Sequence, residues 1–405
     1  MKLDSLKPLL HHQGPLTTVS LDVTRADEAG DRELRGRWNG LRRELESKGA
    51  PGRTLDAIEE VVLRPTHVPG RHGRYVVASG ERILFDRVLA DAPVRDEAFH
   101  DSSPSLLPAV RAADEAVRYL LVEVDRQGAD LSWSGTDSHT PDADAGQVEG
   151  GHDVLHKVRA GGWSHRRMQS RVEDSWERNA EAVAAELERA VNEHRPEHRP
   201  ELVMVTGDVR AVALLRDVVG HSTADLLVEV PGGSRADGVK EEVFAAKLAE
   251  VLEAFRARRR EAVVDRMREA LGRGDGAVTE LSDVVDVLRR GQVDELIILR
   301  NAAGDSVAHL NERSLWVGPD PMQVATSRSD LASLGVEDGD AQELRADIAV
   351  LRAALAQDAG FTFALEGSIS LVDGLGALLR WTDAATPHET APAYGRNNRQ
   401  RRDRR

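Results

Sequence analysis

The chain has 405 residues and a mass of 44.3 kDa, more than one hydrophobic core usually holds, so we expect two or three domains. It contains no cysteine, which excludes disulfides, thiolate metal ligands and cysteine nucleophiles. Its 54 basic and 69 acidic residues give a net charge of −15, which on average disfavours nucleic-acid binding. No run of about 18 apolar residues occurs and the N-terminus lacks the apolar stretch of a signal peptide, so we expect a cytoplasmic protein without membrane contact.

The charge is distributed unevenly along the chain. Residues 154–172 contain five basic residues and no acid, and residues 391–405 contain six arginines against Asp403. The remaining residues are 43 basic and 68 acidic, a balance of −25. Any contact with nucleic acid should therefore concentrate in these two segments.

The first 105 residues are predicted to form an α+β domain. Helical periodicity covers 31–47 and 54–63, and strand-like runs cover 16–23, 75–79 and 82–86. The step Ser79-Gly80-Glu81 predicts a hairpin turn between the last two strands. A polar, proline-containing stretch at 100–105 predicts a domain boundary.

A middle α/β domain is predicted over residues 106–270. Its expected elements are a hairpin (118–124 and 129–133), a polar loop (134–149), a helix from 164 to about 192, an alternation of strand, helix and strand (202–206, 210–219, 225–230), and a second long helix (about 239–270). The helix at 164–192 has the clearest pattern, a single apolar stripe of Met168, Val172, Trp176, Ala180, Val183, Leu187 and Val191. Glycines at 232–238 lack both phosphate-loop spacings, which favours an ordinary loop.

The last predicted domain spans residues 271–385. A helix at 281–290, a strand at 295–300, a helix at 341–355 and strands near 362–365 and 377–381 predict a small α/β sandwich. Residues 386–405 are rich in arginine and proline, which predicts a basic disordered tail.

Known catalytic motifs are absent from the sequence. It has no G-x-S-x-G, H-E-x-x-H or Walker motif. The pairs His152/His156 and His194/His198 lack further ligands, so we expect no metal and no cofactor.

The basic segment at 154–172 has the composition of a phosphate-binding tip. Gly161-Gly162 gives backbone freedom, and Ser164 is a good N-cap for the following helix. The helix N-terminus and the side chains of Arg166, Arg167 and Arg171 would then attract phosphate together. The alternative is a glycine linker before a helix whose basic end is solvated.

The same residues resemble a known family. Gly161-Gly162-Trp163-Ser164, followed by Arg167, Arg171 and a long helix, is similar to the Gly-Gly-Gln loop and its Ser-x-x-Arg continuation in archaeal–eukaryotic-type peptide-chain release factors. The order of elements over about 106–385 is also similar, and the bacterial branch, which includes a ribosome hibernation factor, matches best. The resemblance implies a three-domain architecture of α/β and α+β domains, with a long helix after a Gly-Gly loop in the middle domain.

The sequence departs from this family at the residue that helps to place the hydrolytic water. That glutamine is Trp163 here, and an indole donates one hydrogen bond and accepts none. The stop-codon motif Asn-Ile-Lys-Ser is also absent from residues 1–105. We therefore expect no peptide release at stop codons and assign no catalytic residue.

The resemblance instead implies a non-enzymatic hibernation factor that occupies the A site and places its loop toward the peptidyl-transferase centre. Its expected partners are the 70S ribosome, through 16S and 23S rRNA, and elongation factor Tu by resemblance alone; we expect no DNA partner. Trp163 could stack on a base or ribose, or anchor the loop on its own domain. The expected RNA-binding residues are Lys157, Arg159, Gly161, Gly162, Trp163, Ser164, His165, Arg166, Arg167 and Arg171.

Two other functions stay open from sequence. One is a peptidyl-tRNA hydrolase or ribosome-rescue factor in which His165 or Gln169 activates water. The other is an acidic stress-response scaffold that does not bind RNA.

Overall fold

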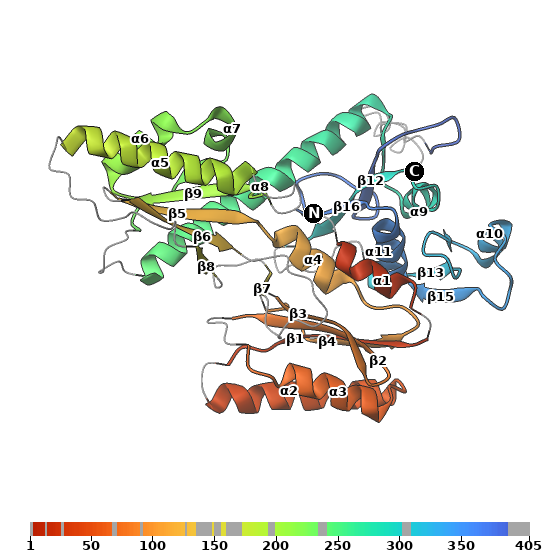
Figure 1. Ribbon diagram of the computed structural model, residues 1–405. Helices are drawn as coiled ribbons and strands as arrows, with labels where there is room; N and C mark the ends of the chain where they lie inside the picture. Colours follow the sequence, from red (N-terminus) through yellow and green to blue (C-terminus); the bar gives the residue numbers. More distant parts are fainter. Residues whose placement is uncertain are drawn as a thin grey trace, which may run out of the picture. The chain divides into compact units, whose positions relative to one another are not determined.

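The computed structural model describes residues 3–12, 14–25, 28–66, 71–89, 92–125, 128–134, 148–149, 155–158, 172–192, 199–233, 241–301 and 309–387. Over these residues the protein is a mixed α/β structure with several separate sheets (Figure 1). The chain divides into two compact units, one formed by 17–98 and 115–257, the other by 1–16, 99–114 and 258–405. The expected three-domain division, with boundaries at 105, 270 and 385, stays a prediction.

The first sheet is built mostly from the N-terminal hundred residues. Its elements are β1 (Leu16–Asp22), α2 (Glu28–Ser47), α3 (Gly52–Val62), β2 (Gly73–Ser79), β3 (Arg82–Leu89), β4 (Glu97–Asp101) and β7 (Val148–Glu149), in the strand order β4-β1-β2-β3-β7. The predicted helices and the first three strands are confirmed. Ser79 pairs with Arg82, and Gly80 between them has a φ of 56°, as a tight hairpin turn requires. The strand β4 was not predicted, and it includes the start of the polar stretch at 100–105.

Helices α2 and α3 cover one face of this sheet (Figure 1). Leu34, Trp38 and Leu45 of α2 are fully buried against strand residues such as Val19 and Val76. Each such side chain stabilises the fold by about 1.5–3 kcal/mol when it leaves water. The sheet also holds a buried ion pair, in which the guanidinium of Arg74 donates to both carboxylate oxygens of Asp86, at 2.7 and 2.6 Å.

The second sheet has the alternating α/β layout that the middle of the sequence predicts. Its elements are β5 (Tyr119–Asp125), β6 (Gly128–Ser134), β8 (Leu155–Val158), α5 (Val172–Asn192), β9 (Leu202–Gly207), α6 (Val209–Val218), α7 (His221–Ala224), β10 (Leu227–Glu229) and α8 (Glu241–Arg273). The strand order is β10-β9-β5-β6-β8; β10, β9 and β5 are parallel, while β6 is antiparallel to both β5 and β8. The predicted β5–β6 hairpin is confirmed.

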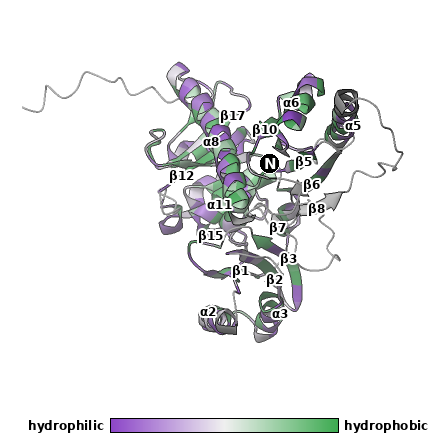
Figure 2. Ribbon diagram, turned by 90° about the vertical axis from the view of Figure 1, so that its left-hand side faces the viewer, coloured by the Kyte–Doolittle hydropathy of each residue, from purple (hydrophilic) through white to green (hydrophobic). Residues whose placement is uncertain are grey.

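Helices lie on both faces of this second sheet. On one face α5 and α6 pack through Val183, Leu187 and Leu215, and on the other face α8 packs through Leu248 and Leu252. In α5, the predicted stripe is confirmed from Ala180 onward, whereas residues 164–171 lie outside the described residues. Hydrophobic and hydrophilic residues alternate along α8 (Figure 2).

The other compact unit contains two small sheets and the helices packed on them. Its elements are a 3-10 turn (Asp4–Leu6), α1 (Lys7–Leu10), α4 (Leu107–Glu115), β11 (Ala277–Val278), α9 (Leu281–Arg289), β12 (Val293–Arg300), a 3-10 turn (Leu310–Glu312), β13 (Ser314–Val317), β14 (Val324–Ala325), α10 (Arg328–Ser333), β15 (Gln342–Arg345), α11 (Ala346–Ala356), β16 (Gly360–Leu365) and β17 (Leu375–Leu379). The sheets have the orders β11-β17-β12-β16 and β14-β13-β15. Helix α11 is buried all round from Ala346 to Leu355.

One expectation about this unit is wrong. The periodicity over 341–355 predicts a single helix, but Gln342–Arg345 form the strand β15, and α11 begins only at Ala346. Each residue of β15 pairs with a residue of β13, from Ser314↔Arg345 to Val317↔Gln342. Pairing with a distant strand outweighs local helical preference here. The strands β13 and β14 and the helix α10 were not predicted.

Candidate functional site

Apart from Lys157, the predicted RNA-binding residues fall between strand β8 of the second sheet and helix α5. Residues 159–171, which include Arg159, Gly161, Gly162, Trp163, Ser164, His165, Arg166, Arg167 and Arg171, lie outside the described residues. Lys157 belongs to β8, where its backbone pairs with Ser132 of β6. The structure therefore places the two ends of this segment, at Val158 and at Val172.

Both ends of the segment lie toward one edge of the second sheet. Because β8 is antiparallel to β6, it runs in the same direction as β5, β9 and β10, toward the edge where these strands have their carboxyl ends. Helix α5 approaches from the same side, since Asn179, about two turns into the helix, lies beside the end of β5. Val172 lies about 10 Å further out along the helix axis. This is the edge at which open α/β sheets usually hold their ligands.

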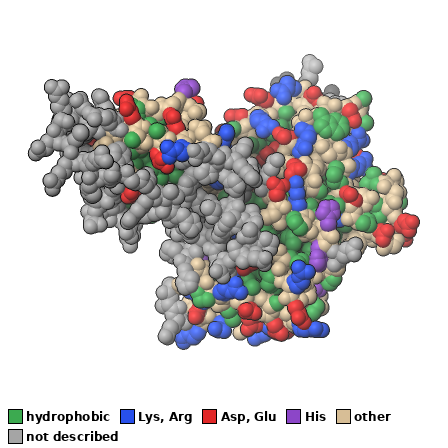
Figure 3. All heavy atoms as spheres, viewed as in Figure 1, with side chains coloured by type: hydrophobic (Ala, Val, Ile, Leu, Met, Phe, Trp, Pro, Cys, Tyr) green, Lys and Arg blue, Asp and Glu red, His purple; other side chains and the backbone are tan. Residues whose placement is uncertain are grey.

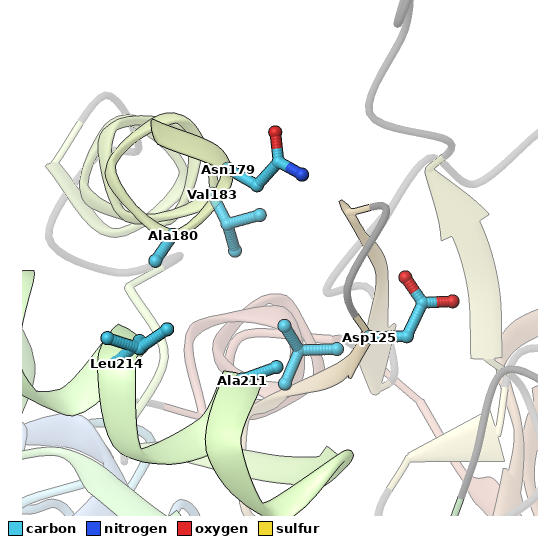
Figure 4. Close-up of a pocket in the computed structure, with 7 residues that line it drawn as sticks. Asp125, Asn179, Ala180, Val183, Ala211 and Leu214 are labelled. Carbon is cyan, nitrogen blue, oxygen red and sulfur yellow. The ribbon is translucent and has the colours of Figure 1, made fainter. Parts of the chain in front are cut away.

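A small hollow lies at this edge between α5, α6 and the end of β5 (Figure 4). The helices α5 and α6 supply Ala180 and Val183 on one side, and Ala211 and Leu214 on the other. Asp125 and Asn179 contribute the polar groups of the lining. The described residues contain no group of three His, Asp or Glu side chains that could hold a metal ion.

The turn from β9 into α6 fixes the geometry of this edge. Gly207 has a φ of 131°, and a Cβ atom at this position would lie 1.8 Å from the carbonyl oxygen of Val124. The next residue, Asp208, donates its backbone N–H to the same carbonyl at 3.0 Å and caps α6 by accepting from the N–H groups of Arg210 and Ala211. The contact lets β9 and β5 stay paired up to the start of α6.

Neither Gly207 nor Asp208 was singled out from the sequence. The signal that could have found them is a glycine directly after a predicted strand, followed by an N-cap residue before a predicted helix. No comparable signal marks Asn179, because it lies inside a regular helical pattern.

The model of a known family matches the same part of the chain. Residues 118–273, which run from β5 to the end of α8, match the model of the Bacterial archaeo-eukaryotic release factor family 2. The resemblance to the bacterial branch of the release-factor family, predicted from the Gly-Gly motif, is confirmed over this range. The finer resemblance, to the ribosome hibernation factor Balon, stays a prediction.

The chain is also similar to individual proteins. A Mycobacterium tuberculosis (strain ATCC 25618 / H37Rv) protein, described as uncharacterized protein Rv2629, is 28% identical over 389 residues, which are 94% of this chain and 97% of that protein. Pelota from Archaeoglobus fulgidus is 14% identical, covers 78% of this chain and 81% of its own, and has a TM-score of 0.35. A ribosome-bound archaeal Pelota is 14% identical, covers 93% of both chains, and has a TM-score of 0.36.

Among the described residues, no helix is both long enough and apolar enough to cross a membrane.

Proposed function

We propose that this protein is a ribosome-binding translation factor of the release-factor type, which enters the A site with segment 159–171 directed toward the peptidyl-transferase centre. The observation that carries this proposal is the family match over residues 118–273, which spans the Gly-Gly-Trp segment and the sheet that holds its two ends. The outward position of Val172 at the carboxyl edge of the sheet fits a segment that reaches away from its domain.

The chemistry of segment 159–171 suits a pocket lined with phosphates. Together with Lys157 it has five basic residues and no acid, in a chain of net charge −15. Arginine binds phosphate through two parallel hydrogen bonds, and glycines allow the backbone a close approach. The acidic remainder of the chain would repel RNA and so limit non-specific binding. Contact with RNA would then depend on segment 159–171 and Lys157.

We assign the protein a blocking role in ribosome hibernation, without hydrolysis. Trp163 stands where release factors of this family have glutamine, and it lacks the acceptor that an amide offers to a water molecule. An indole can instead stack on a base or ribose, whatever the sequence. The 70S ribosome, through 16S and 23S rRNA, and elongation factor Tu are the partners in this proposal.

The double variant Arg166→Glu/Arg167→Glu tests the proposal. We expect its affinity for 70S ribosomes to fall by at least about 100-fold, since two phosphate contacts become repulsive. The measurement is cosedimentation of the full chain with purified 70S particles at several salt concentrations.

A matched control makes the same charge change elsewhere on the protein. Arg210, at the start of α6, and Arg273, at the end of α8, are both exposed. We expect Arg210→Glu/Arg273→Glu to cosediment nearly as well as the wild type. Equal binding by the wild type and the Arg166/Arg167 variant would contradict the role of segment 159–171.

A further inference from the structure

Helix α2 has an outer face that is richer in positive charge than its sequence suggests. Leu34, Trp38 and Leu45 point into the core. Arg32, Arg35 and Arg43 are exposed and form an outer row, in which Arg32 and Arg43 lie on the side of the helix opposite the core residues and Arg35 lies about a quarter of a turn from them. In the space-filling view, basic and acidic side chains are interspersed along the edge formed by α2 and α3 (Figure 3).

The described acidic side chains of α2 are all paired with other cations. The pairs are Asp31 with Arg25 (3.1 Å), Glu33 with Arg37 (3.3 Å), Glu44 with Lys48 (2.6 Å) and Glu46 with Arg42 (3.2 Å). Arg42 also pairs with Asp56 and Glu59 of α3, both at 2.7 Å, and these acids, with Asp56 first, raise its pKa. The negative charges of these acidic side chains are therefore neutralised by neighbouring basic side chains.

The positive charges of the outer row of arginines are not neutralised in this way. Within the part of the chain that the structure describes, Arg32, Arg35 and Arg43 have no hydrogen-bond or ion-pair partner. Gly36 and Gly40, which lie between them, have open space around the position of a Cβ atom. The exposed side of α2 thus presents three arginines that pair with no described acid, beside glycines that leave open space around them.

The spacing of these charges matches an extended polyanion. Arg32 and Arg43 are separated by a rise of about 16 Å along the helix axis. A nucleic-acid strand advances about 3.4 Å per phosphate along a duplex, so the row spans several consecutive phosphates. A guanidinium binds each phosphate through a planar fork of donors.

We propose that Arg32, Arg35 and Arg43 on the outer face of α2 bind an RNA phosphate backbone. This inference rests on the proposed ribosome-binding function and adds a second RNA contact, on the first sheet, to the contact of segment 159–171. It assigns to the N-terminal part of the chain a sequence-independent contact, since phosphates carry no base information.

The test uses the full chain and two probes, purified 70S ribosomes and a fluorescein-labelled RNA duplex of about 20 base pairs. The variant is Arg32→Gln/Arg35→Gln/Arg43→Gln, because glutamine keeps the helix propensity and removes only the charge. The matched control is Arg53→Gln/Arg210→Gln/Arg273→Gln, three exposed arginines outside α2. Kd is measured at several KCl concentrations.

We expect the α2 variant to lower the slope of log affinity against log salt by about 2–3, and to bind at least about tenfold more weakly at low salt. The control should keep the wild-type slope. Circular dichroism and thermal melting check that each variant is folded. The single variant Arg43→Gln, which should lower the slope by about 1, serves if the triple variant does not fold.

Equal slopes for the wild type and the α2 variant on both probes would overturn this inference. If the slopes are equal while 70S binding still depends on Arg166 and Arg167, the inference fails and the proposed function stands. If the wild type binds the duplex through α2 but does not bind 70S, the inference stands and the proposed function fails. If the wild type binds neither the 70S ribosome nor the duplex, both the inference and the proposed function fail.

Discussion

The variant Asp86→Ala should lose about 3–5 kcal/mol of folding free energy, because it leaves the guanidinium of Arg74 buried without its carboxylate. The side chain of Arg74 is 1% exposed. Beyond Asp86, this guanidinium reaches the carbonyl oxygen of Arg64, to which Nη1 donates at 3.3 Å. The carbonyl cannot replace a full negative charge. Equilibrium urea unfolding followed by circular dichroism measures the loss.

An exposed ion pair in the same sheet region provides the control. Arg53 and Glu81 are 2.9 Å apart, and their side chains are 84% and 63% exposed. Glu81→Ala should cost less than about 1 kcal/mol, because water screens that pair. The double variant Arg74→Met/Asp86→Ala should recover part of the loss, since it removes the buried charge as well as its partner. A loss for Asp86→Ala no larger than that for Glu81→Ala would contradict the buried-pair account.

The variant Gly207→Ala should be destabilised by at least about 3 kcal/mol, for two separate reasons. A φ of 131° is strained for any residue with a Cβ atom, at a cost of about 1–3 kcal/mol. The new Cβ would also lie 1.8 Å from the carbonyl oxygen of Val124, a backbone atom that cannot turn away. To relieve the clash, β9 and β5 must separate where α6 begins.

The same substitution at Gly40 gives the opposite expectation. Gly40 lies inside α2, and apart from the helix's own backbone no heavy atom lies within 4 Å of the position that a Cβ atom would take. Gly40→Ala should stabilise the helix by roughly 0.5–1 kcal/mol. Thermal and urea unfolding of the two variants side by side measure both effects. A neutral Gly207→Ala would show that the tight turn after β9 is not a constraint on the second sheet.

Much of the fold could be predicted from residue patterns. The stripe through Ala180, Val183 and Leu187 identifies α5, because a helix buries every third or fourth residue whatever its neighbours are. The β5–β6 hairpin follows in the same way from two apolar runs around a short polar turn. Both features depend only on residues that are close in sequence.

The parts that could not be predicted depend on distant residues. Residues 342–345 have a helical pattern, yet they form β15 because β13, from a separate stretch of the chain, provides a partner. The close contact between Gly207 and Val124 joins two strands that are even further apart in sequence. Local periodicity contains no information about such pairings.

The candidate binding residues, too, include some that could be predicted from the sequence and some that could not. The Gly-Gly-Trp motif was found from sequence because it is a short, contiguous signal, and it led to the family whose model matches residues 118–273. The row of Arg32, Arg35 and Arg43 was missed because α2 contains acids and bases together. Only the structure shows that the acids are paired with Arg37, Arg42 and Lys48, so that the outer row keeps its charge.

Photo-crosslinking from position 163 tests the central claim most directly. A benzophenone amino acid replaces Trp163, the protein is bound to 70S ribosomes and irradiated, and the crosslinked nucleotides are mapped by primer extension. A probe at Arg53, which is exposed in the first turn of α3, serves as the reference. We predict that position 163 crosslinks to 23S rRNA at the peptidyl-transferase centre and that position 53 does not. Crosslinks from position 163 to 16S rRNA alone, or to no rRNA while the protein cosediments with 70S, would contradict the account.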